Sequence, residues 1–294
     1  MNASQTMEGK IVIITGGNSG IGKATATELV HAGATVILAC RDAVKAAAAI
    51  EDIQNATGSN KIEFIPLDLS DLASIRTFAT NFLAKFSRLD VLINNAGVIY
   101  LRKNTTENGF EAQFGVNHLG HFLLTNLLLD TLKKSAPSRV ITVSSAMHFL
   151  GRIDFTSFYA ENGYGPTTAY GQSKLANILF TKELASRLEG TGVTAYCLHP
   201  GAVSTNLFGE LPKPLRKIAD LFLTSPEKAC QTSVYLAQEP GIETLSGSYF
   251  AGKKPARTAP QAKDANLQKK LWEVSADLCK NYLTKRPVKE KAEA

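Results

Sequence analysis

The chain has 294 residues, of which 44% are hydrophobic and 20% are charged, and its formal net charge is +6. These proportions are typical of a folded globular protein and exclude a largely disordered chain. No stretch approaches the roughly 18 consecutive apolar residues of a membrane-spanning helix, and the polar first ten residues do not resemble a secretory signal. We therefore expect a cytoplasmic protein, for which membrane contact is not the favoured interpretation.

The cysteines lie at Cys40, Cys197, Cys230 and Cys279, without a C-x-x-C pair. This spacing predicts neither a zinc site nor a disulfide framework, so we expect reduced thiols and no metal. The basic residues gather only in the tail at 283–294, for which a solvated end is favoured over a contact with a membrane surface or nucleic acid. No nucleic-acid motif is present, so we expect no nucleic-acid partner.

Apolar runs alternate with segments of helical spacing along the whole chain. We expect strands at 10–15, 35–40, 61–68, 91–94, 139–144, 194–198 and 248–250, and helices at 21–32, 43–57, 74–86, 110–134, 170–188 and 226–237. Buried runs separated by helices predict a doubly wound parallel sheet, a Rossmann fold in three α/β/α layers. One catalytic domain at 8–282 is expected between flexible ends at 1–7 and 283–294.

A glycine-rich turn follows the first expected strand and opens the first expected helix. It has the spacing G-x-x-x-G-x-G, not G-x-G-x-x-G. Glycines let the backbone approach a pyrophosphate, and the helix N-terminus offers free N–H groups to that anion. The turn therefore predicts a dinucleotide site formed by Gly16, Asn18, Ser19, Gly20, Ile21 and Gly22.

The end of the second expected strand distinguishes the two nicotinamide cofactors. An acidic residue there would bind the ribose 2′-hydroxyl of NAD, but this chain has Cys40 followed by Arg41. A guanidinium can hold a 2′-phosphate with two hydrogen bonds, which favours NADP(H) over NAD(H). The alternative is a surface arginine paired with Asp42.

Five ordered motifs resemble those of the short-chain dehydrogenase/reductase family over residues 8–252. They are Thr15-Gly-x-x-x-Gly-x-Gly22, Asn94-Asn95-Ala96-Gly97, Asn117, Tyr170-x-x-x-Lys174 and Pro200-Gly201. The segments 106–111 and 114–122 are similar to the retinol dehydrogenase group within that family. Membrane-bound members carry an N-terminal apolar anchor, which this sequence does not show.

The resemblance also implies cofactor contacts beyond the first turn and Arg41. They are Asp68 and Leu69 beside the adenine, Asn95, Ala96, Gly97 and Val116 along the cofactor, Tyr170 and Lys174 near its ribose, and Pro200, Gly201, Val203 and Thr205 over the nicotinamide and its phosphate.

Hydride transfer to a carbonyl leaves an alkoxide that needs a proton, and the resemblance assigns this role to Tyr170. Lys174 lies four residues later, on the same helix face, so we expect its ammonium to lower the tyrosine pKa. Ser145 is expected to hydrogen-bond the substrate oxygen, with Ser144 as the alternative. Asn117 would complete the family's catalytic tetrad by kinking its helix and holding a water that relays protons to Lys174.

Four histidines are further candidates for acid/base work, and we interpret them as structural or pocket-lining because Tyr170 already fills that role. They are His118, His121, His148 and His199.

Two inserts follow expected strand ends, where open α/β sheets bind ligands. The segment 148–164 is rich in aromatic residues, and the segment 204–225 has apolar residues at helical spacing opposite basic ones. The second insert has three interpretations: a helix that covers the core, a mobile lid over a lipophilic pocket, or a membrane-surface contact.

These observations predict an NADP(H)-dependent oxidoreductase that interconverts a lipophilic aldehyde or ketone and its alcohol, as a monomer or homodimer. The alternative is a nucleotide-binding regulatory or scaffold protein without turnover, which the complete set of Asn117, Ser145, Tyr170 and Lys174 argues against. A nucleotide-sugar epimerase would have a differently spaced glycine turn and a larger C-terminal domain.

Overall fold

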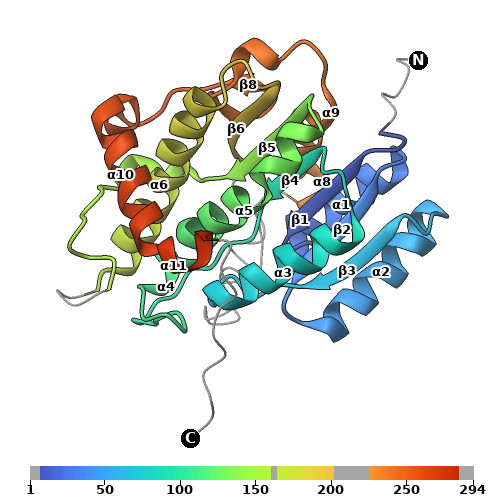
Figure 1. Ribbon diagram of the computed structural model, residues 1–294, viewed down its shortest axis with the longest axis horizontal. Coiled ribbons are helices and arrows are strands. Elements are labelled where there is room, and N and C mark those ends of the chain that lie inside the picture. Colours follow the sequence, from blue (N-terminus) through green and yellow to red (C-terminus); the bar gives the residue numbers. More distant parts are fainter. Residues whose placement is uncertain (1–6, 160–163, 202–224, 285–294) are drawn as a thin grey trace, which may run out of the picture.

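The computed structural model describes residues 7–159, 164–201 and 225–284. An eight-stranded sheet in the order β3-β2-β1-β4-β5-β6-β7-β8 runs through its centre (Figure 1). Every neighbouring pair is parallel except β7 and β8. The strands are β1 (Ile11–Thr15), β2 (Thr35–Cys40), β3 (Ile62–Pro66), β4 (Val91–Asn94), β5 (Ser138–Val143), β6 (Val193–His199), β7 (Tyr249–Ala251) and β8 (Lys254–Pro255).

Helices cover both faces of this sheet. On one face lie α1 (Gly20–His31), α2 (Ala43–Thr57), α8 (Pro226–Ala229) and α9 (Gln231–Gln238). On the other lie α3 (Leu72–Lys85), α4 (Ala112–Phe114), the π-helical η1 (Gly115–Leu119), α5 (Gly120–Lys134), α6 (Pro166–Arg187), α10 (Ala265–Leu278) and α11 (Lys280–Leu283). Short 3-10 turns are η2 (Ala146–Leu150), η4 (Glu243–Leu245) and η5 (Pro260–Lys263).

The three layers arise because successive apolar side chains of each strand point to opposite faces of the sheet. In β1, Ile13 packs in the core beneath α3, α5 and α6, whereas Val12 and Ile14 pack in the core beneath α1, α2 and α9. Successive side chains of a strand point to opposite faces, so a run that is apolar throughout must be covered twice. The predicted doubly wound α/β/α sheet is confirmed.

The strand order reverses between β1 and β4, and this reversal positions the site. The chain moves outward from β1 to β2 and β3, then returns to β4 and moves the other way to β7. The two halves separate at the carboxyl ends of β1 and β4, where open α/β sheets bind ligands. The turns after Thr15 and Asn94 meet at this point.

The long helix expected at 110–134 begins later and is not regular. Glu111 caps it, because its carboxylate accepts hydrogen bonds from the N–H groups of Gln113 and Phe114, both at 2.8 Å. Its next turn, η1, is a π-helix in which the Gly120 N–H bonds to the Gly115 carbonyl. A π turn adds one residue to the helical repeat, so the side chains before and after it face new directions.

Other element boundaries differ from the expectation in smaller ways. β3 covers only Ile62–Pro66, not 61–68, and α6 begins at Pro166, one turn before Tyr170. Proline is favoured in the first turn of a helix because a backbone N–H at that position would have no partner within the helix, so its absence costs nothing. The helix expected at 226–237 is divided at Cys230 into α8 and α9.

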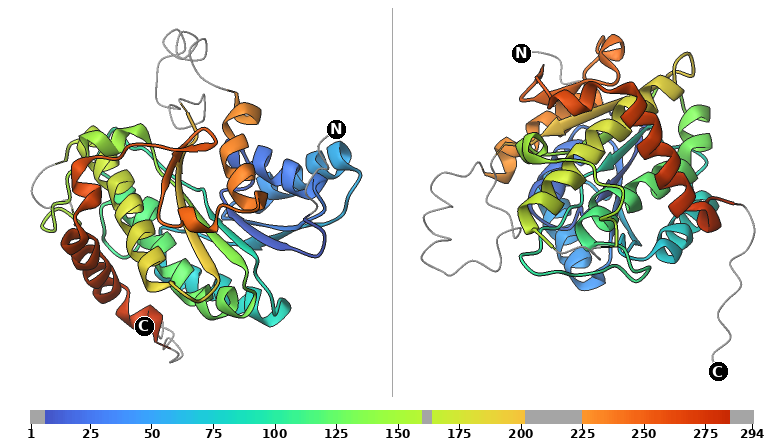
Figure 2. Two further views of the ribbon diagram at one scale, coloured as in Figure 1. Left: turned by 90° about the horizontal axis from the view of Figure 1, so that it is seen from above. Right: turned by 90° about the vertical axis from the view of Figure 1, so that its left-hand side faces the viewer.

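The C-terminal helices were not predicted from the sequence. Asp264 caps α10 with hydrogen bonds from the N–H groups of Asn266 and Leu267, and α10 then packs along α6. Trp272 stacks on Phe180 and meets the edge of Phe122, while the Arg187 guanidinium lies 4.5 Å from the indole centre. Both views in Figure 2 show α10, in red, beside α6.

Among residues 7–159, 164–201 and 225–284, none of the helices combines the length and the apolar character that a bilayer crossing requires. Within the same ranges no group of histidine, cysteine and acidic side chains could hold a metal ion. The cysteines are free and buried.

Truncating the ring that anchors α10 should destabilise the domain. We expect Trp272→Ala to lower the free energy of unfolding by about 3 kcal/mol, because the contacts with Phe122, Phe180 and Arg187 are lost. Urea denaturation followed by circular dichroism measures the change. Val44→Ala is the control: its side chain is 81% exposed, so its effect should stay within about 0.5 kcal/mol. Equal stabilities of the two variants would contradict the docking of α10.

Candidate active site

The glycines of the turn after β1 occupy positions that would not tolerate a side chain. Gly16 and Gly20 have φ angles of +63° and +51°, which L-residues rarely adopt. A Cβ on Gly22 would lie 2.3 Å from the Gly16 carbonyl oxygen and 2.7 Å from Nδ2 of Asn95. These close approaches explain why the turn needs glycine at these positions.

The helix that starts in this turn has an open N-terminus. Ser19 occupies the cap position of α1 in an extended conformation, and its side chain makes no capping hydrogen bond. The first N–H groups of a helix have no partner within it and carry a positive partial charge. Together with the close-packed glycines, this uncapped end fits the pyrophosphate of a dinucleotide.

Arg41 follows the last residue of β2 and is exposed, without an ion pair within the described part of the chain. Asp42 does not pair with it. Its carboxylate caps α2 by accepting from the Lys45 N–H at 3.0 Å and also pairs with the Lys45 ammonium at 3.1 Å. These contacts hold the pKa of Asp42 below its usual value.

Asp68 and Leu69 follow the neighbouring strand β3 at the same edge of the sheet. The Asp68 carboxylate accepts from the N–H and the hydroxyl of Ser70, at 2.9 and 2.7 Å. Leu69 is buried against the start of α5, where a Cβ on Gly120 would lie 2.8 Å from the Leu69 carbonyl oxygen.

The segment after β4 is fastened to the glycine-rich turn. Asn95 donates from Nδ2 to the Thr15 carbonyl at 2.8 Å, and the N–H groups of Asn95 and Ala96 each lie 2.9 Å from the Thr15 hydroxyl oxygen. A Cβ on Gly97 would lie 3.2 Å from Nζ of Lys174. The expected cofactor segment and the expected catalytic lysine therefore meet.

Asn117 lies in the π-helical η1, and its side chain joins three elements. Oδ1 accepts from the Val98 N–H at 2.7 Å, while Nδ2 donates to the Val98 carbonyl and to the Ser173 hydroxyl, both at 3.0 Å. Ser173 directly precedes Lys174 in α6. The expected kink is thus a π turn, and Val116 beside it is buried.

The two serines after β5 have different surroundings. Ser144 is buried and donates to the Lys174 carbonyl at 2.7 Å, so it fixes α6 against the sheet. Ser145 is partly exposed and caps η2, and its interaction with the Tyr170 hydroxyl lowers the pKa of that phenol. This difference supports the choice of Ser145 over Ser144.

Burial controls the protonation of Tyr170 and Lys174. It raises the pKa of Tyr170 to about 12, and the interaction with Ser145 offsets only part of this effect. It also lowers the pKa of Lys174 to about 8. Nζ of Lys174 lies 5.5 Å from the Tyr170 ring centre and donates to the Val143 carbonyl at 3.2 Å.

The expected net lowering of the Tyr170 pKa is therefore wrong for this structure. Removal of the phenol from water penalises the phenolate more than its neighbours stabilise it. Tyr170 is protonated at neutral pH.

The four histidines that were expected to be structural are neutral packing or bridging groups. Burial lowers the pKa of His118 to about 3 and of His121 to about 4, and it also lowers the pKa of His148 and His199. His148 lies nearest to the serines. Its Nδ1 is 2.7 Å from the Ser145 carbonyl, and its Nε2 accepts from the Ala259 N–H.

The aromatic residues of the segment 148–164 divide between the core and the surface. Phe158 is buried and stacks on Phe114 with ring centres 3.9 Å apart, and Phe155 meets the edge of Phe158. Phe149, Leu150 and Tyr159 of the same segment are exposed.

Part of the expected nicotinamide end lies outside the described residues. Pro200 and Gly201 follow β6 at the same sheet edge, and Gly201 has a φ of +93°. Val203 and Thr205 lie outside the described residues, as does almost all of the segment expected as a lid at 204–225.

Comparisons with known proteins place this arrangement in a family. The family model for short chain dehydrogenases matches residues 10–215. The chain belongs to the short-chain dehydrogenase family. It is 48% identical to retinol dehydrogenase 11 of Mus musculus, over 92% of this chain and 87% of that protein, and 49% identical to retinol dehydrogenase 13 of Homo sapiens, over 93% and 85%.

Solved structures agree with this placement. An uncharacterized protein from Mycobacterium Paratuberculosis is 39% identical with a TM-score of 0.77, covering 94% of this chain and 95% of that one. The Pseudomonas aeruginosa RhlG/NADP active-site complex is 28% identical with a TM-score of 0.68, covering 85% and 97%. This short-chain dehydrogenase thus falls in the retinol dehydrogenase-like group and is an oxidoreductase that acts on alcohol or carbonyl groups.

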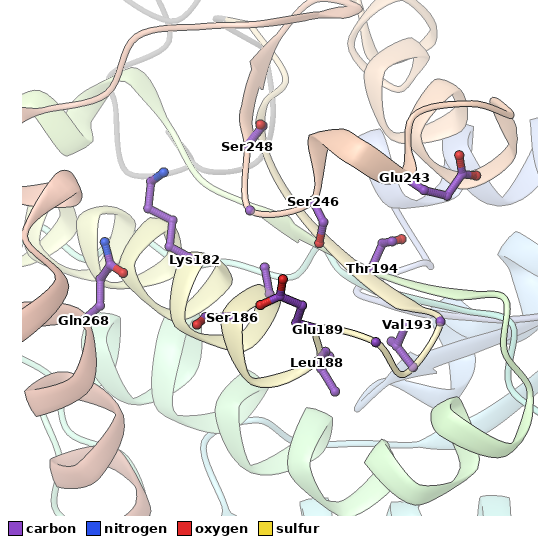
Figure 3. Close-up of a pocket in the computed structure, with 14 residues that line it drawn as sticks. Lys182, Ser186, Leu188, Glu189, Val193, Thr194, Glu243, Ser246, Ser248 and Gln268 are labelled. Carbon is purple, nitrogen blue, oxygen red and sulfur yellow. The ribbon is translucent and has the colours of Figure 1, made fainter.

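A separate cavity of about 610 Å³ lies away from these residues (Figure 3). Its walls come from the end of α6, the first residues of β6 and the turn before β7, and they include Lys182, Thr194, Glu243 and Ser248. The beginning of β6 is the opposite end of the strand from His199 and Pro200. None of the predicted site residues of the dehydrogenase lines this cavity.

Sequence reasoning missed Thr15 and Ser173 as parts of the site. Thr15 connects β1 to the segment after β4, and Ser173 receives the Asn117 amide. Both lie inside motifs that were recognised, Thr15-Gly-x-x-x-Gly-x-Gly22 and Tyr170-x-x-x-Lys174. Thr15 directly precedes Gly16 and Ser173 directly precedes Lys174, which was the only sign in the sequence that they belong to the site. Residue spacing does not reveal which distant groups their hydroxyls bind.

The pKa of Lys174 predicts how dinucleotide affinity depends on pH. Burial holds this pKa at about 8, so the ammonium is present at lower pH and is lost as the pH rises through that value. If the charge helps to bind the cofactor, NADPH affinity should fall about tenfold between about pH 7 and about pH 9. NADPH fluorescence titrations at constant ionic strength measure the dissociation constant. Lys174→Met should bind more weakly and show no such dependence; a wild-type profile as flat as that of the variant would contradict the prediction.

Proposed function

We propose that this oxidoreductase uses NADP(H) to interconvert a lipophilic aldehyde or ketone and its alcohol, with Tyr170 as the acid/base. The observation that supports this most is the cluster of Ser145, Tyr170 and Lys174 at the carboxyl edge of the sheet, beside the segment that holds Gly97.

The protonation state of Tyr170 suits carbonyl reduction. With a pKa of about 12 the phenol carries its proton at neutral pH, and an alkoxide is a stronger base than a phenolate. The hydroxyl can therefore donate to the oxygen of the substrate as negative charge develops there. Bound NADPH supplies the hydride.

The neighbours of Tyr170 divide the remaining tasks. Ser145 would donate its hydroxyl to the same substrate oxygen and hold it in place. Lys174 would stabilise the phenolate left after proton donation, because its ammonium lies 5.5 Å from the ring centre. Asn117 would keep the Gly97–Val98 segment and α6 at a fixed separation through its amide.

NADP(H) is favoured over NAD(H) by the surroundings of Arg41. Its expected alternative partner, Asp42, is occupied by Lys45 and by the cap of α2, so the guanidinium is available for a 2′-phosphate. The similar Pseudomonas aeruginosa RhlG structure is an active-site complex of that protein with NADP.

The names of the relatives and the exposed apolar residues support a lipophilic substrate. The retinol dehydrogenases are named for an apolar alcohol. In this chain Phe149 and Leu150, 53% and 62% exposed, follow Ser145 in η2 and would contact such a molecule. A panel of aldehydes and ketones that differ in chain length, assayed with NADPH and NADH by reduced-nicotinamide absorbance, tests the proposal. Absence of turnover on the whole panel, despite cofactor binding, would contradict it.

Removing the proton donor should stop the chemistry without affecting cofactor binding. Tyr170→Phe deletes only the hydroxyl, and we expect kcat to fall by at least about 100-fold while the NADPH dissociation constant changes by less than about twofold. Steady-state kinetics and fluorescence titration measure the two effects. Tyr159→Phe is the matched control, because this tyrosine packs on Phe110, has no role in the proposed chemistry and should keep wild-type turnover. Near-normal rates in Tyr170→Phe would refute its role.

Reversing the charge at Arg41 should change the cofactor preference. Arg41→Asp removes the proposed 2′-phosphate contact and adds an acceptor for a ribose hydroxyl, so the ratio of kcat/KM for NADPH to that for NADH should fall by at least about tenfold. Arg41→Lys keeps the charge and should retain the preference for NADPH. An unchanged ratio in Arg41→Asp would mean that Arg41 does not contact the cofactor.

A further inference from the structure

His121 is a buried histidine that the proposed chemistry does not use. It is the second residue of α5, one turn after Asn117, and only 1% of its surface is exposed. Its Nε2 lies 2.9 Å from the Thr15 hydroxyl oxygen, and its Nδ1 lies 3.1 Å from the Asn117 carbonyl oxygen. The ring therefore bridges the end of β1 and the π turn.

The hydrogen bonds of Thr15 determine which nitrogen of His121 accepts. The hydroxyl oxygen receives the N–H of Ala96 and that of Asn95, the latter shared with the Ile93 carbonyl at 3.0 Å. Since a hydroxyl oxygen has two lone pairs, its proton must point elsewhere. The two acceptors in reach are Nε2 of His121 at 2.9 Å and the Ile93 carbonyl at 3.4 Å, so the proton goes to His121.

The other end of the ring requires the same tautomer. The Asn117 carbonyl can only accept, so Nδ1 of His121 must carry a proton. With Nδ1 protonated and Nε2 free, the imidazole is neutral. Burial lowers the pKa of His121 to about 4, and the nearby Lys174 ammonium acts in the same direction. The ring is thus a neutral donor and acceptor of fixed orientation.

This bridge holds the segment after β4 at its first end, whereas Asn117 holds the other. The Asn117 side chain binds both backbone polar groups of Val98. The Asn117 carbonyl, acting through His121 and Thr15, orients the hydroxyl that receives Asn95 and Ala96. Gly97 lies between these attachments and faces Nζ of Lys174.

We propose that His121, as the neutral Nδ1-protonated tautomer, is a positioning residue that fixes the Asn95–Val98 segment relative to Lys174 and Tyr170. This role rests on the proposed function. Through this role, Asn117 in the π-helical η1 fixes both ends of the Asn95–Val98 segment, which would lie along the nicotinamide. A shift of about 1 Å in such a segment can cost about 100-fold in rate.

Three substitutions separate the two halves of the bridge. His121→Gln can place an amide oxygen near the position of Nε2 and keep the acceptor for Thr15. His121→Asn can place an amide nitrogen near Nδ1 and keep the donor to Asn117. His121→Leu loses both. We expect kcat to fall about 100-fold in His121→Leu, with partial recovery in the Gln and Asn variants and with a smaller change in the KM of the carbonyl substrate.

His118→Leu is the matched control. His118 is also a buried neutral histidine next to Asn117, but its Nε2 lies 2.9 Å from the Ser275 hydroxyl of α10 and not near Thr15. This variant should lose stability in thermal unfolding while its kcat stays within about threefold of wild type. If His121→Leu and His118→Leu lowered kcat equally at equal loss of stability, the positioning role would be overturned.

A readout that does not depend on turnover tests the bridge itself. In protein labelled with ¹⁵N-histidine, the imidazole correlations of His121, assigned by their loss in His121→Leu, should show a neutral ring protonated at Nδ1 near neutral pH. A charged ring or an Nε2-protonated ring would overturn the proposal. If the ring has the expected tautomer but wild-type protein reduces no carbonyl, the proposed function fails while the bridge stands. If wild type is active and all three His121 variants equal it, the positioning role alone fails.

Discussion

The side-chain amide of Asn117 is the interaction on which the site depends. It binds the backbone of Val98 through both of its polar atoms and the hydroxyl of Ser173, so it joins the segment after β4 to the helix that carries Tyr170 and Lys174. The π turn around it is what allows this side chain to face both partners. A regular helix from Ala112 to Lys134 would direct the amide elsewhere, and the segment after β4 would lose this attachment to α6.

Burial shifts the pKa values of Tyr170 and Lys174 in opposite directions. The environment disfavours charge, so the pKa of Tyr170 rises and that of Lys174 falls. The same environment keeps His121 and His118 neutral and thereby excludes competing acids from the interior. A protonated phenol of raised pKa keeps its proton until a stronger base, such as an alkoxide, is present, and a neighbouring ammonium can stabilise the phenolate formed then.

Much of this could be predicted because the sheet and the motifs depend on local patterns. Strands that are apolar throughout predicted a parallel sheet with helices on both faces. The four-residue spacing placed Tyr170 and Lys174 on one face of a helix. The pKa of Tyr170 was predicted in the wrong direction, because spacing reveals a neighbour but not the loss of water around both groups. Asp42 directly precedes an expected helix, a position that favours capping of that helix over an ion pair with Arg41, and it does cap α2. The aromatic residues of the insert could not be assigned from composition, because a ring such as Phe158 suits a pocket wall and a core equally well.

The docking of α10 determines what the outer side of α5 and α6 presents to other molecules. Phe122 and Phe180 would form an apolar surface there, but the indole of Trp272 covers them within the same chain. The outward residues of α10 are instead charged, among them Lys269, Lys270, Glu273 and Asp277. Two copies that met along this side would therefore touch through hydrated ionic side chains, and any association through the aromatic rings would first require the chain to release its own C-terminal helix.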